Sequence, residues 1–144
     1  MDILYAQPYT VRWSDLDANG HMKNTAYVEC GMQVRLAFFA ENGFPFSEFQ
    51  KQRFGPVIFR EEITYFKEIH MLETIRTTFH FSKLSDDGGR FTLKNILLKE
   101  GDVKAAELIT DGAWFDLGTR KLIPPPAKLL EIMRLIYVPP AVDE

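Results

Sequence analysis

The stretch 25–40 is apolar along almost its whole length and limits the folds open to this chain. From Ala26 onward it is polar only at Glu29, Gln33 and Arg35. A run of this length favours a helix over a strand, and a helix that is apolar on nearly every side must be buried on nearly every side. Asn24 is expected to cap its start. The rest of the chain must therefore supply surfaces that cover this helix.

Strand patterns fill most of the remaining sequence. Between residues 7 and 14, Tyr9, Val11 and Trp13 alternate with polar residues, which predicts a strand with one buried face. Four later segments are rich in aromatic and β-branched residues or alternate in polarity, which predicts strands at 57–69, 73–84, 90–99 and 103–115. The short turns between these four predict a meander of antiparallel neighbours.

Two further helical segments are expected outside these strands. Gly43 is expected to end the apolar helix. One helical turn is predicted at 47–52, before the pair Gly55-Pro56 closes the connector. Three prolines at 124–126 end the sheet, and the helical spacing of apolar residues over 127–137 predicts a short C-terminal helix that packs on the core or on another subunit.

These elements predict one α+β domain over residues 1–144, with neither repeat nor linker. One strongly curved antiparallel sheet wrapped around the long helix would cover its apolar surface. This architecture is the hotdog fold. A single layer of this kind leaves a sheet edge and part of the helix poorly covered, so we predict a homodimer joined edge to edge, or a dimer of dimers.

The composition argues against several classes of function. The net charge of −3 and the acidic pI argue against a nucleic-acid partner. No apolar run is long enough to span a membrane, and the N-terminus lacks the pattern of a signal peptide. The single cysteine, Cys30, lies within the apolar run and suits a reducing cytosol, where it acts as a small hydrophobe rather than a catalytic thiol. We therefore expect a cytoplasmic protein without a membrane partner.

The polar stretch 15–24 separates the first predicted strand from the helix. Its opening, Asp15 to Gly20, matches the start of a calcium-binding EF-hand loop. The bidentate Glu that such a loop needs at its twelfth position is replaced by Ala26, and Lys23 would place a cation among the ligands. A strand, not a helix, also leads into the loop. These differences argue against calcium.

A zinc site is also not expected. His21, His70 and His80 are far apart in sequence, and none is paired at helical spacing. Two roles remain open for His21, a hydrogen-bond partner that braces the loop or a catalytic group. No metal and no cofactor is predicted.

The two acids of the loop differ in their expected roles. Asp15 is expected to accept hydrogen bonds from loop amides, and Gly20 to supply the backbone freedom for the turn. Asp17 lies just ahead of the buried helix, close to the free N–H groups of the first turn. Such groups form a ready site for developing negative charge.

The residues from Asp15 to Asn24, followed by Tyr27, resemble the D-x-D-x-x-G-H-x-N-N-x-x-Y signature of the 4-hydroxybenzoyl-CoA thioesterase-like branch of the hotdog superfamily. The resemblance extends from the strand with Trp13, through the helix, to the strands after residue 56. It implies hydrolysis of an acyl-CoA or acyl-carrier-protein thioester.

The resemblance also implies roles for individual residues. Asp17 would be the catalytic carboxylate, which either attacks the thioester carbonyl or activates a water. The backbone N–H of Asn24 would support the oxyanion, and His21 or the Asn24 side chain would orient the carbonyl or the water. Tyr27 belongs to the same signature and is expected to contact the substrate. A thiolate leaves readily, so a strong general acid is not essential.

Two departures from the family pattern keep an alternative open. Lys23 stands where the signature has its first Asn, and the turn 85–89, which is basic in an aromatic-substrate relative, is acidic here. Lys83 and Arg90 are then the candidate contacts for CoA phosphates, or else solvated charges at strand ends. The alternative is a hotdog protein that binds an acyl thioester without hydrolysing it. Dehydration of an acyl thioester is a third reaction of the superfamily, which the Asp17-to-Asn24 signature disfavours.

Overall fold

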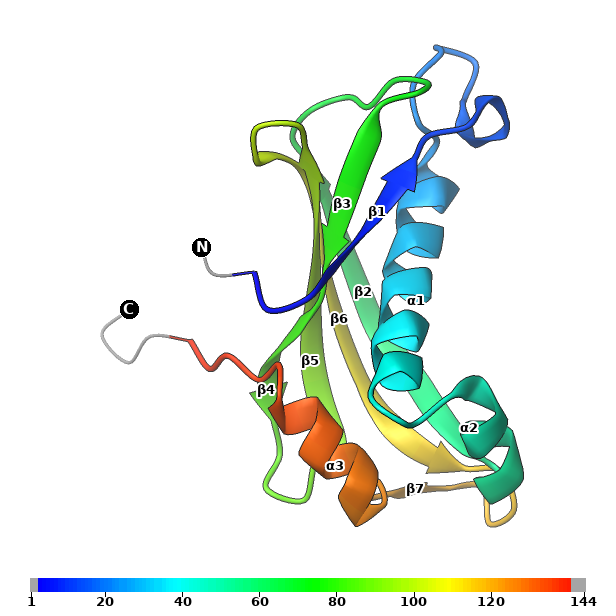
Figure 1. The fold of residues 1–144 in the computed structure, drawn as a ribbon. Helices are drawn as coiled ribbons and strands as arrows, with labels where there is room; N and C mark the ends of the chain where they lie inside the picture. The colour runs from blue at the N-terminus through cyan, green and yellow to red at the C-terminus, as the bar shows by residue number, and fades with distance from the viewer. Residues whose placement is uncertain (1–2, 141–144) are drawn as a thin grey trace.

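The computed structural model describes residues 3–140, which form one antiparallel sheet with helices on one side (Figure 1). The main strand order is β1-β3-β5-β6-β2. The bounds are Ala6–Thr10 for β1, Thr74–Thr78 for β3, Arg90–Lys99 for β5, Val103–Asp116 for β6 and Phe54–Tyr65 for β2. Two shorter strands extend the sheet, β4 (His80–Leu84) beside β5 and β7 (Lys121–Ile123) beside β6. This α+β arrangement is consistent with the predicted hotdog fold.

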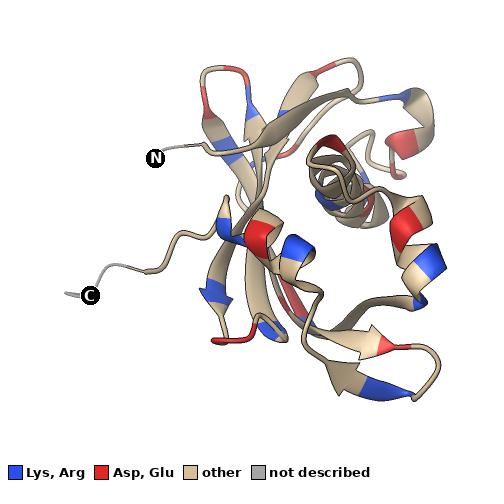
Figure 2. Cartoon of the chain, turned by 60° about the horizontal axis from the view of Figure 1, so that its bottom comes forward, with Lys and Arg blue, Asp and Glu red and all other residues tan. Residues whose placement is uncertain are grey.

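Helix α1 (Asn24–Glu41) confirms the helix predicted from the apolar run. The sheet curves around it, as the end-on view in Figure 2 shows. One side of α1 is buried against the sheet and carries Tyr27, Val34 and Phe38. The expected burial on nearly every side is wrong for a single chain, because the side chains of Met32 and Leu36 are 53% and 42% exposed. One sheet covers only the face of the helix that it contacts.

The sequence predicted the end of α1 correctly but not the residue at its start. Lys23, not Asn24, occupies the N-cap position, and no side chain caps the helix start. The N–H of Lys23 donates instead to the Asp15 carbonyl at 2.7 Å, which ties the preceding loop to the helix. At the other end Gly43 adopts a φ of 91°. The N–H of Phe44 then reaches the Phe39 carbonyl at 2.8 Å, which confirms the predicted glycine-ended helix.

The first strand is shorter than predicted. It ends at Thr10, and Trp13 lies in a 3₁₀ turn with its side chain 80% exposed rather than buried. The cause is Asp15, whose carboxylate accepts the Arg12 N–H at 2.8 Å and the Tyr9 hydroxyl at 2.5 Å. These bonds fold the chain back before the alternating pattern is complete.

The predicted meander is confirmed only from β3 to β6. Strand β2 pairs with β6 instead of β3, and so lies at the far edge of the sheet. The reason is the segment 66–73, which forms no hairpin but crosses the end of the sheet. There the Met22 N–H donates to the Ile69 carbonyl and the Leu72 N–H to the Val11 carbonyl, both at 2.8 Å.

Strand boundaries differ from the prediction in three further places. The strand predicted at 73–84 is divided into β3 and β4 at Phe79, whose N–H donates to the Tyr5 carbonyl at 3.0 Å instead of to the sheet. Gly55 and Pro56, expected to close a connector, lie within β2. Strand β7 was not predicted. Its three residues are too short to show a pattern.

Both predicted short helices are present, although their first or last residues differ from the predicted ones. Helix α2 spans Phe46–Gln52 and α3 spans Ala127–Arg134. Leu129, Ile132 and Met133 of α3 are buried in an aromatic core that joins the lower half of α1, α2 and the sheet. A second core lies under the first half of α1, around Val11, Tyr27 and Ile69. Among residues 3–140, no helix is long and apolar enough to cross a membrane.

Candidate active site

A cleft of about 370 Å³ lies at the start of α1 and brings together four of the residues that sequence predicted. These are Asp17, His21, Asn24 and Tyr27. The rest of its lining comes from Met22 and from the segment that follows β2, residues 65–68. Residues more than forty positions apart in sequence thus meet at one end of the sheet.

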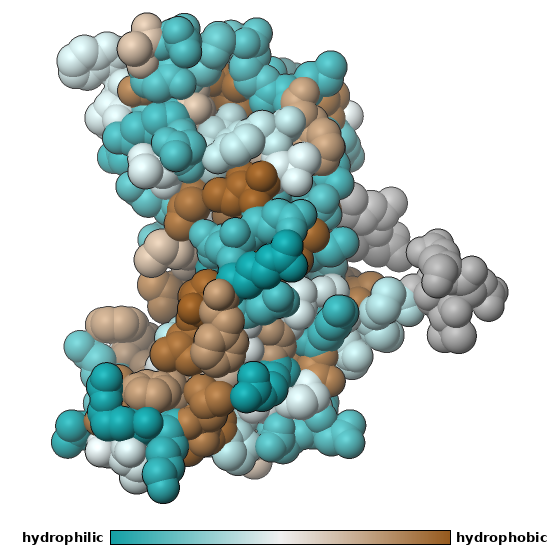
Figure 3. All heavy atoms as spheres, turned by 180° about the vertical axis from the view of Figure 1, so that it is seen from behind, coloured by the Kyte–Doolittle hydropathy of each residue, from teal (hydrophilic) through white to brown (hydrophobic). Residues whose placement is uncertain are grey.

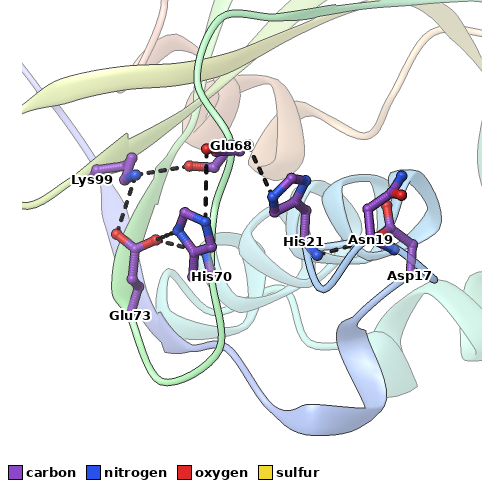
Figure 4. A network of polar contacts seen from close by, with 7 residues as sticks. All are labelled: Asp17, Asn19, His21, Glu68, His70, Glu73 and Lys99. Atoms are coloured by element: carbon purple, nitrogen blue, oxygen red, sulfur yellow. Dashed lines mark hydrogen bonds and ion pairs between the residues drawn. The ribbon is translucent and has the colours of Figure 1, made fainter.

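The loop holds Asp17 through its own backbone. The Oδ1 atom of Asp17 accepts the N–H of Asn19 at 2.8 Å and the N–H of His21 at 3.1 Å (Figure 4). Gly20 makes this turn with a φ of 76°, as expected. The Oδ2 atom accepts no hydrogen bond within residues 3–140. One carboxylate oxygen is therefore fixed by the loop, while the other has no hydrogen-bond partner among the described residues.

Asn24, at the start of α1, lines the same cleft. Asn24 is the first residue of the helix, and its backbone N–H donates to no group among the described residues. The free N–H groups of a helix start carry partial positive charge and attract anions. Asp17 and the residue that carries this N–H thus line one cleft.

Asp15 has the bracing role that sequence predicted. Its side chain is buried, 3% exposed. Burial alone would raise the pKa of Asp15, but the hydrogen bonds from Tyr9 and from the Arg12 backbone outweigh it and hold that pKa below its ordinary value. Asp15 thus stays ionised and fixes the loop, and it lies outside the cleft.

Tyr27 reaches the cleft from the first turns of α1. Its ring packs edge-on against Tyr65 of β2, with ring centres 5.0 Å apart. Burial, together with the nearby Tyr65 and Asp17, raises the pKa of Tyr27 to about 12. Its hydroxyl therefore remains protonated at neutral pH and can donate a hydrogen bond.

Cys30 does not act as a nucleophile. Its thiol is buried, and burial raises its pKa to about 11.

The histidines are closer than their sequence spacing suggested. His21 and His70 face each other across an antiparallel bridge, with ring centres 5.2 Å apart, although they are far apart in sequence. Glu68 lies between them, with its Oε2 atom 3.0 Å from His21 Nε2. No local motif could reveal this, because the contact depends on the path of 66–73. His80 is on β4 and does not join the cluster.

Lys83 and Arg90 do not line the cleft of this chain. They lie on β4 and at the start of β5, and the turn between these strands is at the opposite end of the sheet from the start of α1 (Figure 1). The cation that lines the cleft is Lys67, which sequence analysis did not single out. Elsewhere, charged residues of both signs are dispersed over the elements (Figure 2).

A second cavity, of about 620 Å³, lies between α1, α2 and the sheet. Aromatic side chains form much of its wall, among them Phe39, Phe49, Phe54 and Trp114. Arg35 and Glu61 are the charged groups among its described lining residues. Val28, one turn after Asn24 on α1, also lines it. An apolar space is therefore present along the helix that begins at the cleft.

Known structures share this fold at low sequence identity. A hypothetical protein from Aquifex aeolicus is 22% identical with a TM-score of 0.82, over 90% of this chain and 98% of that one. A 1,4-dihydroxy-2-naphthoyl-CoA thioesterase from Synechocystis is 14% identical with a TM-score of 0.81, over 90% and 95%. A hypothetical protein from Staphylococcus aureus in complex with CoA is 18% identical with a TM-score of 0.80, over 95% and 86%.

A family model matches most of the chain. No curated protein matches the chain. The model of the Thioesterase-like superfamily matches residues 11–133, which include the loop, the cleft, the whole of α1 and the sheet from β2 to β7. This match covers most of the chain, and the chain therefore belongs to the Thioesterase-like superfamily.

Proposed function

We propose that this protein is a thioesterase that hydrolyses an acyl-CoA, or an acyl-carrier-protein thioester, to a carboxylic acid and a free thiol. The observation that carries the proposal is that Asp17 and Asn24, the first residue of α1, line one cleft. Family membership and the similar structure of the 1,4-dihydroxy-2-naphthoyl-CoA thioesterase support it.

The mechanism needs few groups. Asp17 either takes a proton from a water, whose oxygen then attacks the thioester carbonyl, or attacks that carbon itself to give an anhydride that water opens. In both cases the carbonyl oxygen becomes negative and the Asn24 N–H stabilises it. Collapse of the tetrahedral intermediate breaks the C–S bond, and the thiolate leaves and takes up a proton. His21 and Tyr27 would orient the carbonyl or the water.

Isosteric replacement of Asp17 tests the proposal. Asp17→Asn keeps an oxygen that can accept the two loop N–H groups, so the loop should keep its shape. Removal of the carboxylate should lower kcat/KM about 10²–10⁴-fold. The measurement is free-thiol release from a panel of acyl-CoA substrates. Asp86→Asn, in an exposed turn, is the matched control and should retain the full rate. An equal rate in wild type and Asp17→Asn would reject Asp17.

One observation favours the non-hydrolytic alternative. Two backbone N–H groups occupy Asp17 Oδ1, as they would in a carboxylate whose only role is to brace a turn. A binding protein would retain acyl-CoA of several chain lengths, measured by calorimetry, and release no thiol from any of them. A thioesterase would release thiol from at least one substrate of the panel.

Binding of the CoA phosphates can be tested separately from chemistry. Lys67 lines the cleft, whereas Lys83 and Arg90 do not, although they remain the prediction from sequence. Lys67→Ala should raise KM for acyl-CoA and leave kcat nearly unchanged, because it removes binding shared by ground and transition states. Lys83→Ala and Arg90→Ala are measured beside it. A raised KM in these two alone would favour the original prediction, with the phosphates held by another part of the assembly.

The acyl group is expected to be apolar. The aromatic cavity along α1 is of the size and character of a small-molecule site. Leu36→Trp would place a larger side chain at its wall and should lower kcat/KM more for long acyl chains than for acetyl-CoA. Equal loss for all chain lengths would mean that this cavity does not hold the acyl group.

A further inference from the structure

We propose that His21, Glu68 and His70 form a binding site for a divalent transition-metal ion, with zinc as the preferred probe. Their ligand atoms all lie within 4.8 Å of one another. The proposal concerns metal binding and does not rest on the proposed thioesterase activity. Two imidazoles and one carboxylate are a known set of protein ligands for zinc with a position left open for water.

The distances between these ligand atoms suit one ion. Glu68 Oε2 is 3.0 Å from His21 Nε2, and Glu68 Oε1 is 3.8 Å from His70 Nε2. Ligand atoms bound to one tetrahedral zinc ion stand about 3.4 Å apart, given bonds of about 2.0–2.2 Å. Small side-chain rotations would therefore bring both Nε2 atoms and a Glu68 carboxylate oxygen into a single coordination sphere.

The backbone already holds the two ligand-bearing segments together. His21 and His70 form an antiparallel bridge, and next to it the Met22 N–H donates to the Ile69 carbonyl at 2.8 Å. Figure 4 shows the three side chains gathered between the loop and the segment after β2. Metal binding would thus need no rearrangement of the chain, which favours affinity.

A second carboxylate orients His70. Glu73 Oε2 is 3.3 Å from His70 Nδ1 and also accepts the His70 backbone N–H at 2.6 Å. A histidine that gives Nδ1–H to a carboxylate presents Nε2 as the free, more basic nitrogen, as metal-bound histidines commonly do. The contact from Glu73 therefore points the correct nitrogen of His70 toward Glu68.

The local charge also permits a cation. Lys99 is close, with its ammonium 3.4 Å from Glu73 Oε1 and 2.8 Å from the Glu68 backbone carbonyl. Its positive charge would repel a metal ion, but its ammonium pairs with the carboxylate of Glu73 rather than with that of Glu68. Two carboxylates against one ammonium leave a net charge of −1 when both imidazoles are neutral. A dication would be attracted to this cluster.

Competition for zinc with a colour-forming chelator of micromolar affinity tests the site on the metal-free full chain. Wild type should bind one zinc ion per chain. His21→Ala and His70→Ala should lose this binding, and Glu73→Gln should weaken it about 10–100-fold. His80→Ala is the matched control and should bind as wild type does. Failure of wild type to compete, or equal binding by His70→Ala, would overturn the proposal.

Cobalt gives an independent readout of the ligands. Bound Co²⁺ should show the visible absorption bands of a four-coordinate ion in wild type and His80→Ala, and no such bands in His70→Ala. A thiolate-to-cobalt band in the near ultraviolet would assign the metal to Cys30 and overturn the site. Circular dichroism of each variant verifies that a loss of binding is not a loss of folding.

Discussion

Asp15 and Asp17 stand two residues apart in one loop, yet their carboxylates lie in different surroundings. Asp15 is buried and satisfied by Tyr9 and Arg12, whereas Asp17 lines the cleft with one oxygen free. The difference follows from the turn, which directs one side chain inward and the next acid toward the helix start. One acid is therefore part of the buried structure, and the other lines the cleft.

Asp15→Asn should destabilise the fold by about 1.5–3 kcal/mol at pH 7, because it replaces a buried charged acceptor of hydrogen bonds. The folded-state pKa of Asp15 is lowered, so this stabilisation is complete above the unfolded pKa of about 4 and is lost as pH falls through the folded value. Urea unfolding at neutral pH and at about pH 3 should show the gap between variant and wild type closing at the lower pH.

Asp86→Asn provides the reference for this measurement. Asp86 is exposed in the turn after β4, and its replacement should change the unfolding free energy by less than about 0.5 kcal/mol. A gap for Asp15→Asn that is the same at both pH values would show that packing, and not the ionised carboxylate, is what the variant loses.

The sequence could assign Asp15 and Gly20 to a shaped turn because turn chemistry is local. It could not bring His21 to His70, since that contact needs the course of 66–73 across the sheet end. Lys67 was missed for the same reason. Residues that a distant segment delivers to a site carry no signal in their own neighbourhood.

The helix α1 illustrates the same limit at the scale of an element. Its existence and its glycine end follow from local composition, and both are confirmed. Which of its apolar faces is covered depends on the position of β2, which pairs with β6 and lies at the sheet edge. The predicted meander failed there because residues 66–73 cross the end of the sheet instead of forming a hairpin.

The glycine end of α1 can be tested directly. Gly43→Ala should cost about 1–2 kcal/mol, since φ is 91° there and an L-residue is strained in this region. Gly55→Ala, in β2, is the control, because no atom lies within 4 Å of an added Cβ there and φ is not positive. Chemical denaturation of both variants measures the difference. Equal effects at the two positions would show that the backbone at Gly43 tolerates a side chain.

The whole molecule leaves a large apolar surface uncovered in a single chain. Ile58 and Phe59 of β2 are 46% and 58% exposed, and Met32 and Leu36 are exposed on α1. Figure 3 shows apolar side chains forming a band across the face opposite to that of Figure 1. Such a patch beside an open strand edge is typical of a surface that pairs with another chain.

We therefore expect a homodimer, or a dimer of dimers, joined through the β2 edge. Ile58→Glu would place a charge in this surface and should shift the protein toward monomer in sedimentation velocity. Val103→Glu is the matched control, because Val103 is similarly exposed, at 42%, but lies at the start of β6. It should sediment as wild type does. A wild-type protein that sediments as a monomer and hydrolyses acyl-CoA would contradict pairing through β2, and it would place all catalytic groups within one chain.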